Sequence, residues 1–285
     1  MSTSRTDKFS VAPWSSEPYI PTLETPLRCV LRPHFANTQV HLHSHPWAQM
    51  ILSSQGVVRI HTGKMTFTVP PHRAIWIPPQ ILHTASVLED AQLYSLFIYA
   101  AEEKSEQESA ESPWLTCKVI EVRPLLHELV VALAEDDFDR FRSDRYRSLI
   151  KLVNVEISRA PVLPLGVPLP AERRLRMLCE NFLAAPRLDR SVADLSREVG
   201  ASVSTVSRLF QAEIGCSFSE WRKQVFLAEA LTLAAKGLSV SQIAFELGYS
   251  SLSSFSFMVT QLVGIPPGKL LKMRPDVTEF QTVVP

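Results

Sequence analysis

A helix cannot run through residues 159–171, which read R-A-P-V-L-P-L-G-V-P-L-P-A. Four prolines fall within ten positions of this stretch. Each proline removes a backbone N–H and blocks the helical backbone, and a proline-rich segment prefers an extended conformation. The chain has 285 residues, long enough for two domains of ordinary size. We therefore predict a linker over residues 159–170 that separates two domains.

The residues before this linker have the pattern of a β-rich domain. Short runs of β-branched and aromatic residues occupy much of 55–99, and Gly56, Gly63 and two Pro-Pro pairs separate them. This spacing is typical of an antiparallel sandwich or barrel, so we predict a jelly-roll-like β-barrel. Aliphatic residues then recur at helical spacing within 121–158, which predicts two helices. They pack on the sheet or form a dimer interface, and the pattern alone favours neither.

The residues after the linker have no strand pattern and divide into short helices. Ser191 and Ser202 are predicted N-caps of two helices that meet at Gly200. The arrangement recurs 48 residues later, where two serine-capped helices meet at Gly248. Helix, glycine-containing turn, helix is the arrangement of DNA-binding motifs, although a plain helical bundle also produces such a repeat. We predict an all-α domain with two helix–turn–helix units.

Composition and charge exclude several classes of protein. No apolar run approaches the ~18 residues that a membrane-spanning helix needs. Met1–Ser16 lacks the apolar core of a signal peptide, so we expect a cytoplasmic protein. The four cysteines have no Cys-x-x-Cys spacing and are expected to be reduced thiols. Residues 171–285 hold 13 Lys and Arg against 11 Asp and Glu, which permits nucleic-acid binding without predicting it.

All eight histidines lie before the linker, and three of them have the spacing of a metal site. His43 and His45 are two residues apart, so both side chains are expected on one face of a strand. His83 is expected to converge with them from a neighbouring strand of a small barrel. Three imidazoles at one point suit Zn²⁺, Ni²⁺ or Fe²⁺, with Gln49 as a fourth but poorer ligand. A metal site, a metal-free effector pocket and a purely structural set of histidines all stay open.

Three motifs in the helical part are specific. They are S-V-A-D-L-S-R-E-V-G-A-S-V-S-T-V-S-R-L-F-Q-A-E-I-G at 191–215, L-S-V-S-Q-I-A-F-E-L-G-Y-S-S-L-S-S-F at 238–255 and G-I-P-P-G-K at 264–269. Residues 171–272 thereby resemble the DNA-binding domain of the AraC/XylS transcription regulators. The resemblance implies seven helices, with two recognition helices that enter successive major-groove segments of double-stranded DNA. The DNA-binding candidates are Ser202, Ser204, Ser207, Arg208, Ser251, Ser253, Ser254, Ser256 and Phe257.

The second recognition helix departs from that family. Regulators of this kind usually have Arg or Lys where this chain has Phe257, and a basic pair at 260–261, where it has Thr and Gln. Phe226 stands where the family generally has Arg in the connecting helix. The segment 249–267 is therefore neutral, and we predict that base specificity rests mainly on Arg208 of the first unit. The alternative is that the second unit only stabilises the fold of the domain and contacts no bases.

The histidine motifs carry a second resemblance. H-S-H-P-W-A-Q-M at 43–50 and V-P-P-H-R-A-I-W-I-P-P-Q-I-L-H at 69–83 resemble the cupin sensor domain that precedes this DNA-binding domain in one branch of the family, with Gln49 in place of the usual Glu. The resemblance implies a cavity for a small effector, and aromatic walls with a few polar groups suit a planar ligand. The candidate effector-binding residues are Trp47, Gln49, Arg59, His61, Trp76 and His83.

These patterns together predict a two-domain α+β chain that acts as a one-component transcription regulator and not as an enzyme. A small molecule or metal in the cupin barrel would change how the helical domain binds DNA. A second copy of the chain, in a homodimer, and RNA polymerase are further expected partners; no cofactor is certain, and a divalent metal is the one candidate. The alternative hypothesis is a metal-dependent cupin enzyme with a vestigial helix–turn–helix domain. The predicted segments are 1–120 (effector-binding domain), 121–158 (helical connector), 159–170 (linker), 171–272 (DNA-binding domain) and 273–285 (tail).

Overall fold

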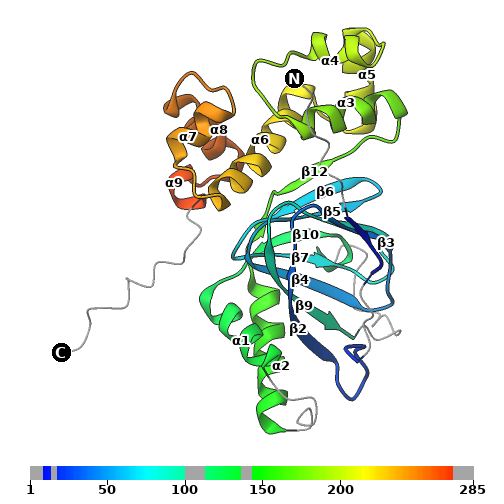
Figure 1. Ribbon diagram of the computed structural model, residues 1–285, viewed down its shortest axis with the longest axis vertical. Helices are drawn as coiled ribbons and strands as arrows, with labels where there is room; N and C mark the ends of the chain where they lie inside the picture. The colour runs from blue at the N-terminus through cyan, green and yellow to red at the C-terminus, as the bar shows by residue number, and fades with distance from the viewer. Residues whose placement is uncertain (1–8, 14–17, 100–112, 136–142, 272–285) are drawn as a thin grey trace, which may run out of the picture.

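The computed structural model describes residues 9–13, 18–99, 113–135 and 143–271. Figure 1 shows a sheet-rich N-terminal half and a helical C-terminal half. The two-domain α+β class predicted from the sequence is confirmed at this level. The predicted tail at 273–285 lies outside the described residues. Among the helices described, none is long and apolar enough to cross a membrane.

Two six-stranded sheets make up the described part of the N-terminal half. The first sheet has the strand order β1 (Phe9–Val11), β3 (Thr38–His43), β8 (His83–Val87), β5 (Val58–Thr62), β6 (Met65–Val69) and β12 (Gly166–Pro168). The second has the order β11 (Val162–Leu163), β10 (Lys118–Glu121), β7 (Arg73–Ile77), β4 (Ala48–Gln55), β9 (Ala91–Ile98) and β2 (Leu27–His34). All pairs are antiparallel except β1 with β3. Among the described strands, β5 and β6 are the one neighbouring pair joined by a short hairpin loop, and the other neighbours are distant in sequence, so the chain crosses repeatedly between the two sheets.

The second sheet separates a cavity from a helical layer. Side chains alternate along β4, so Ile51 faces the cavity while Met50 and Leu52 pack with α1 (Pro124–Ala134) and α2 (Asp144–Arg159). The buried Tyr146 of α2 donates its hydroxyl proton to the backbone oxygen of Leu27 on β2. The two helices predicted within 121–158 therefore pack on their own sheet, and Figure 1 shows them beside β9 and β2.

The proline-rich segment differs from the predicted linker. It forms two short edge strands, since β11 pairs with β10 in one sheet and β12 pairs with β6 in the other. Edge strands tolerate proline because one side of the strand makes no ladder hydrogen bonds. The backbone is extended, as predicted, but the segment completes both sheets and does not hang free between domains. This long-range pairing has no signal in the local sequence.

The helical half consists of α3 to α9. The serine N-caps and glycine turns predicted from the sequence are confirmed. The helices are α3 (Arg173–Ala184), α4 (Val192–Glu198), α5 (Val203–Glu213), α6 (Phe218–Ala235), α7 (Val240–Glu246), α8 (Leu252–Val263) and α9 (Pro267–Leu270). Ser191, Ser202 and Ser251 cap α4, α5 and α8, each accepting a hydrogen bond from the backbone N–H three residues on. Gly200 and Gly248 have φ of 65° and 87° in the turns that join α4 to α5 and α7 to α8.

The two halves share one hydrophobic core. Buried side chains of the sheets and of α3 to α9 form a single cluster, and α6 packs on β6 and β12. Trp221 of α6 donates its indole N–H to the backbone oxygen of Pro168 across 2.8 Å. Lys236 follows the end of α6, and its Nζ atom lies 3.7 Å from Oε1 of Glu89, just after β8. The first sheet and the central helix of the other half are therefore in direct contact.

Candidate effector pocket and candidate DNA-binding helices

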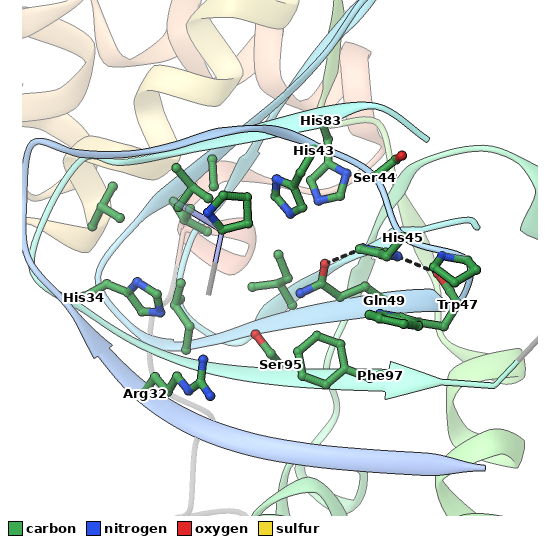
Figure 2. A pocket seen from close by; sticks show the side chains of 18 residues that line it. Arg32, His34, His43, Ser44, His45, Trp47, Gln49, His83, Ser95 and Phe97 are labelled. Atoms are coloured by element: carbon green, nitrogen blue, oxygen red, sulfur yellow. Dashed lines mark hydrogen bonds between the residues drawn. The ribbon is translucent and has the colours of Figure 1, made fainter. Parts of the chain in front are cut away.

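A cavity of about 390 Å³ lies between the two sheets. Its walls come from β2, β3, β4, β5, β8 and β9, and Figure 2 shows its polar side chains pointing inward from several of these strands. The apolar lining includes Ile51, Val58, Leu93 and Phe97. This size and mixture of surfaces is that of a small-molecule site.

Three histidines meet at one end of the cavity. One ring nitrogen from each of His43, His45 and His83 lies within 4.8 Å of the others. His43 and His83 are cross-strand partners of β3 and β8, and their ring centroids are 4.2 Å apart. The expectation that His43 and His45 share one strand is wrong, because β3 ends at His43 and His45 lies in the loop that follows. The loop turns the His45 ring back toward the pair, as Figure 2 shows.

Each of the three rings is held by a backbone carbonyl. The Nδ1 atoms lie within hydrogen-bonding distance of carbonyl oxygens, at 2.8 Å for His43 with His41, 2.7 Å for His45 with Trp47 and 2.8 Å for His83 with Ile81. A neutral imidazole has one N–H, which donates to that oxygen, so Nε2 has a lone pair. The Trp47 ring stacks on His45 at 5.3 Å between centroids and fixes it further. These contacts hold the three rings in fixed orientations.

Burial favours the neutral form of His45 and His83 by lowering the pKa of both imidazoles. Desolvation, together with the neighbouring imidazoles of His43 and His45, lowers the pKa of His83 to about 4, against a hydrogen bond to the Ile81 backbone that raises it. Desolvation also lowers the pKa of His45, against hydrogen bonds to Trp47 and Gln49 that raise it. Both groups therefore titrate below pH 7 and present lone pairs near neutral pH.

Gln49 lies beside the histidines, and Arg32 lies toward the opposite end of the cavity. The Gln49 Oε1 atom is 3.0 Å from His45 Nε2. Arg32 comes from β2, with its guanidinium over the Tyr19 ring at 5.2 Å from the centroid. His34 follows on the same face of the strand. None of the residues that line the described cavity is an aspartate or a glutamate.

Three of the predicted effector-binding residues lie outside this cavity. Arg59 and His61 alternate with the inward-facing Val58 and Ile60 on β5, so they occupy the opposite face. Trp76 of β7 faces the helical layer and donates its indole N–H to the backbone oxygen of Trp114 across 2.9 Å. The structure thus corrects the prediction for these three residues, whereas Trp47, Gln49 and His83 line the cavity.

Arg32, His34 and Phe97 line the cavity but were not predicted. The sequence does indicate that Arg32 and His34 belong together, since they are two residues apart and share one face of β2. This indication is obscured because the apolar Leu31 of the same strand is exposed. The strand therefore reverses the usual pattern, in which apolar residues face inward and polar residues face solvent.

Most of the predicted DNA-binding side chains are exposed on α5 and α8. On α5, Ser204, Ser207 and Arg208 are exposed, and within the described residues no ion pair involves Arg208. On α8, Ser253, Ser254 and Phe257 are exposed, with Ser256 half-buried. The exposed Ser202 and Ser251 use their hydroxyls as N-caps.

Phe226 is an internal side chain of the helical half. It is 1% exposed, and its ring centroid lies 5.8 Å from those of Phe182 and Tyr249. Tyr249 belongs to the turn between α7 and α8. Phe226 thus packs the central helix α6 against α3 and against the turn that precedes α8.

Comparison with known proteins agrees with this architecture. Residues 25–150 match the family model of the AraC-like ligand binding domain, and residues 195–273 match a helix-turn-helix domain model. The chain therefore belongs to the AraC-type regulators: it is a DNA-binding transcription regulator with an N-terminal ligand-binding domain.

Among its relatives is the HTH-type transcriptional regulator NimR of Escherichia coli, 29% identical over 230 residues, which are 81% of each chain. The regulator RipA of Corynebacterium glutamicum is 31% identical over 100 residues, 35% of this chain and 30% of RipA. Among solved structures, ToxT from Vibrio cholerae O395 aligns at 13% identity and a TM-score of 0.38, over 88% of this chain and 99% of ToxT.

Proposed function

We propose that an effector bound between the two sheets changes how α5 and α8 engage operator DNA. The supporting observation is the short path from the cavity to the helical half. Val87 of β8 lines the cavity, and two residues later Glu89 pairs with Lys236 at the end of α6. On the same sheet β5, with Val58 in the cavity wall, pairs with β6, on which α6 packs. An effector that prefers one arrangement of this sheet shifts the population of DNA-binding states.

In this proposal α4–α5 and α7–α8 are both helix–turn–helix units, and the cavity lies in a cupin-like barrel. Arg208 contacts a guanine edge or a phosphate, and the exposed serines of both helices contact phosphates. The exposed Phe257 packs on a thymine methyl group. Because DNA is the partner, the protein acts in the cytoplasm.

The chain is proposed to act as a homodimer. The outer face of the helical layer presents Leu125 of α1 with Leu152 and Val155 of α2, all of them exposed. Leu152 and Val155 are three residues apart and share one face of α2. Two operator half-sites on one face of the duplex suit such a pair of subunits. Contact with RNA polymerase stays a prediction.

A metal-dependent enzyme is the second candidate function, and the three histidines favour it. General acid–base chemistry needs a titratable group beside the substrate. The lining of the described cavity offers histidines but no carboxylate for this purpose. The known relatives are regulators, so the regulator is preferred.

The test compares Arg208→Ala with Arg147→Ala for binding to the protein's own upstream DNA and to a scrambled duplex. Arg147 is an exposed arginine of α2, paired with Asp144, and controls for the loss of one positive charge. Arg208→Ala should cost about 1–3 kcal/mol of specific binding, roughly 5- to 150-fold, if Arg208 contacts a base. Arg147→Ala should leave binding unchanged. Equal affinities for both variants and the parent would contradict the role of α5.

A further inference from the structure

The three histidines form a donor set that one metal ion fits. Because each Nδ1 faces a carbonyl oxygen, the nitrogens available to an ion are the three Nε2 atoms. The carbonyl contacts fix tautomer and ring orientation, as the outer partners of metal-bound histidines do. Tetrahedral Zn²⁺ with nitrogens at ~2.1 Å needs them about 3.4 Å apart. One ring nitrogen of each histidine already lies within 4.8 Å of the others, so rotation of the rings can bring three nitrogens to this separation.

The contact between His45 and Gln49 points to the same position. Nδ1 of His45 lies 2.7 Å from the Trp47 oxygen, and its Nε2 lies 3.0 Å from Gln49 Oε1. A neutral ring has one proton for these two acceptors, so the lone pairs of Nε2 and Oε1 face each other. A cation between them removes this repulsion. The other solution is a Gln49 amide turned so that its NH₂ group donates to Nε2, which leaves no donor atom for an ion.

The charge of the cavity determines what else it binds. Three imidazoles and an amide are neutral, so a bound divalent ion keeps its full charge. The described lining contains no carboxylate that would compensate the ion. A charge that is largely removed from water and has no compensating partner is strongly unfavourable. An anionic ligand compensates it, and its apolar body contacts Ile51, Leu93 and Phe97.

We propose that His43, His45 and His83, with Gln49, hold one divalent transition-metal ion, and that this ion anchors an anionic effector through an oxygen donor. The effector class is a small carboxylate with an apolar or aromatic body that fits a cavity of about 390 Å³. This inference rests on one part of the proposed function, namely that the effector binds in this cavity. The metal binds the charged group, the apolar walls bind the body, and Arg32 lies toward the far end (Figure 2).

The metal is tested with Co²⁺ and purified, chelator-stripped full-length protein. One equivalent of Co²⁺ should bind and show the visible absorption of a low-coordinate nitrogen site. His83→Ala should weaken Co²⁺ binding by at least about 100-fold, because even outer partners of a metal site contribute 10–100-fold. His41→Ala is the matched control, since His41 is an exposed histidine on β3 outside the cavity lining. Circular dichroism confirms that each variant is folded.

Gln49→Glu is a second variant that tests the metal site even if His83→Ala does not fold. A carboxylate in place of the amide should tighten Co²⁺ binding and compensate one positive charge of the ion. The anion is tested with benzoate against its neutral analogue benzamide on the Co²⁺-loaded protein. Benzoate should change the Co²⁺ absorption bands and benzamide should not. In Gln49→Glu the benzoate affinity should fall by about tenfold, the effect of ~1.4 kcal/mol.

Each result decides one part of the proposal. Absence of Co²⁺ binding, or equal binding by His83→Ala and the parent, would overturn the metal site. Equal responses to benzoate and benzamide, or tighter benzoate binding by Gln49→Glu, would overturn the anionic class. Binding of metal-free protein to its upstream DNA is measured in parallel. A protein that binds this DNA but no Co²⁺ refutes the inference and leaves the proposed function standing, whereas one that binds Co²⁺ but no DNA refutes the proposed function alone.

Discussion

Replacing Phe226 by alanine should destabilise the helical half far more than the same change at Phe257. Phe226 is 1% exposed, and its ring lies 5.8 Å from Phe182 of α3 and from Tyr249 before α8. Truncation of a buried phenylalanine costs about 3–5 kcal/mol, which combines lost burial with the cavity left behind. Phe257 is 68% exposed, and a surface substitution stays within about 0.5 kcal/mol.

The measurement is urea unfolding of the full-length variants, followed by circular dichroism and tryptophan fluorescence. The slope m is about 1–3 kcal/mol/M for small domains, so a loss of 4 kcal/mol lowers the midpoint by about 1.3–4 M. Trp221 lies within the same aromatic cluster and reports on this core. Midpoints that agree for Phe226→Ala and the parent would refute the structural role of Phe226. A larger loss for Phe257→Ala would refute the assignment of Phe257 to the surface.

Three smaller changes test other parts of the fold. Trp221→Phe removes the hydrogen bond to Pro168 between the two halves, and leaving that partly buried carbonyl unpaired should cost about 1 kcal/mol in urea unfolding. Gly56→Ala should destabilise the sheet domain by more than 1 kcal/mol, because Gly56 has φ of 74° and a Cβ there would lie 2.2 Å from the Asp90 oxygen; a thermal shift assay measures it. Ser202→Ala removes the N-cap of α5 and should cost about 0.5–2 kcal/mol by the same assay. An unchanged midpoint in any of the three would contradict the contact concerned.

The helical half was predictable because its signals are local. Serine caps, glycine turns and apolar spacing all lie within a few residues of the helices that they define, as at Ser202 and Gly248. The edge strands within 159–170 were not predictable in this way. They pair with β10 and β6, and such pairing depends on the assembled sheets.

The candidate site was predictable in part. The spacing of His43, His45 and His83 indicated a cluster, and the structure brings these rings together. Strand β2 was hidden, because its apolar Leu31 is exposed while its polar Arg32 faces the cavity. A cavity with polar walls inverts the usual alternation of a half-buried strand, so the pattern that finds ordinary strands fails at the functional site.

The most direct test of the account is binding of the purified protein to its own upstream DNA and to a scrambled duplex, between 50 and 200 mM salt. Each phosphate contact adds about 0.9 to the slope of log K against log salt, about 3.5-fold in affinity over this range. We predict clear preference for the upstream DNA. We also predict a salt slope nearer to the phosphate contacts of one helix–turn–helix unit than of two, since 249–267 is neutral. Equal, weak binding to both duplexes would contradict the assignment of this chain as a sequence-specific regulator.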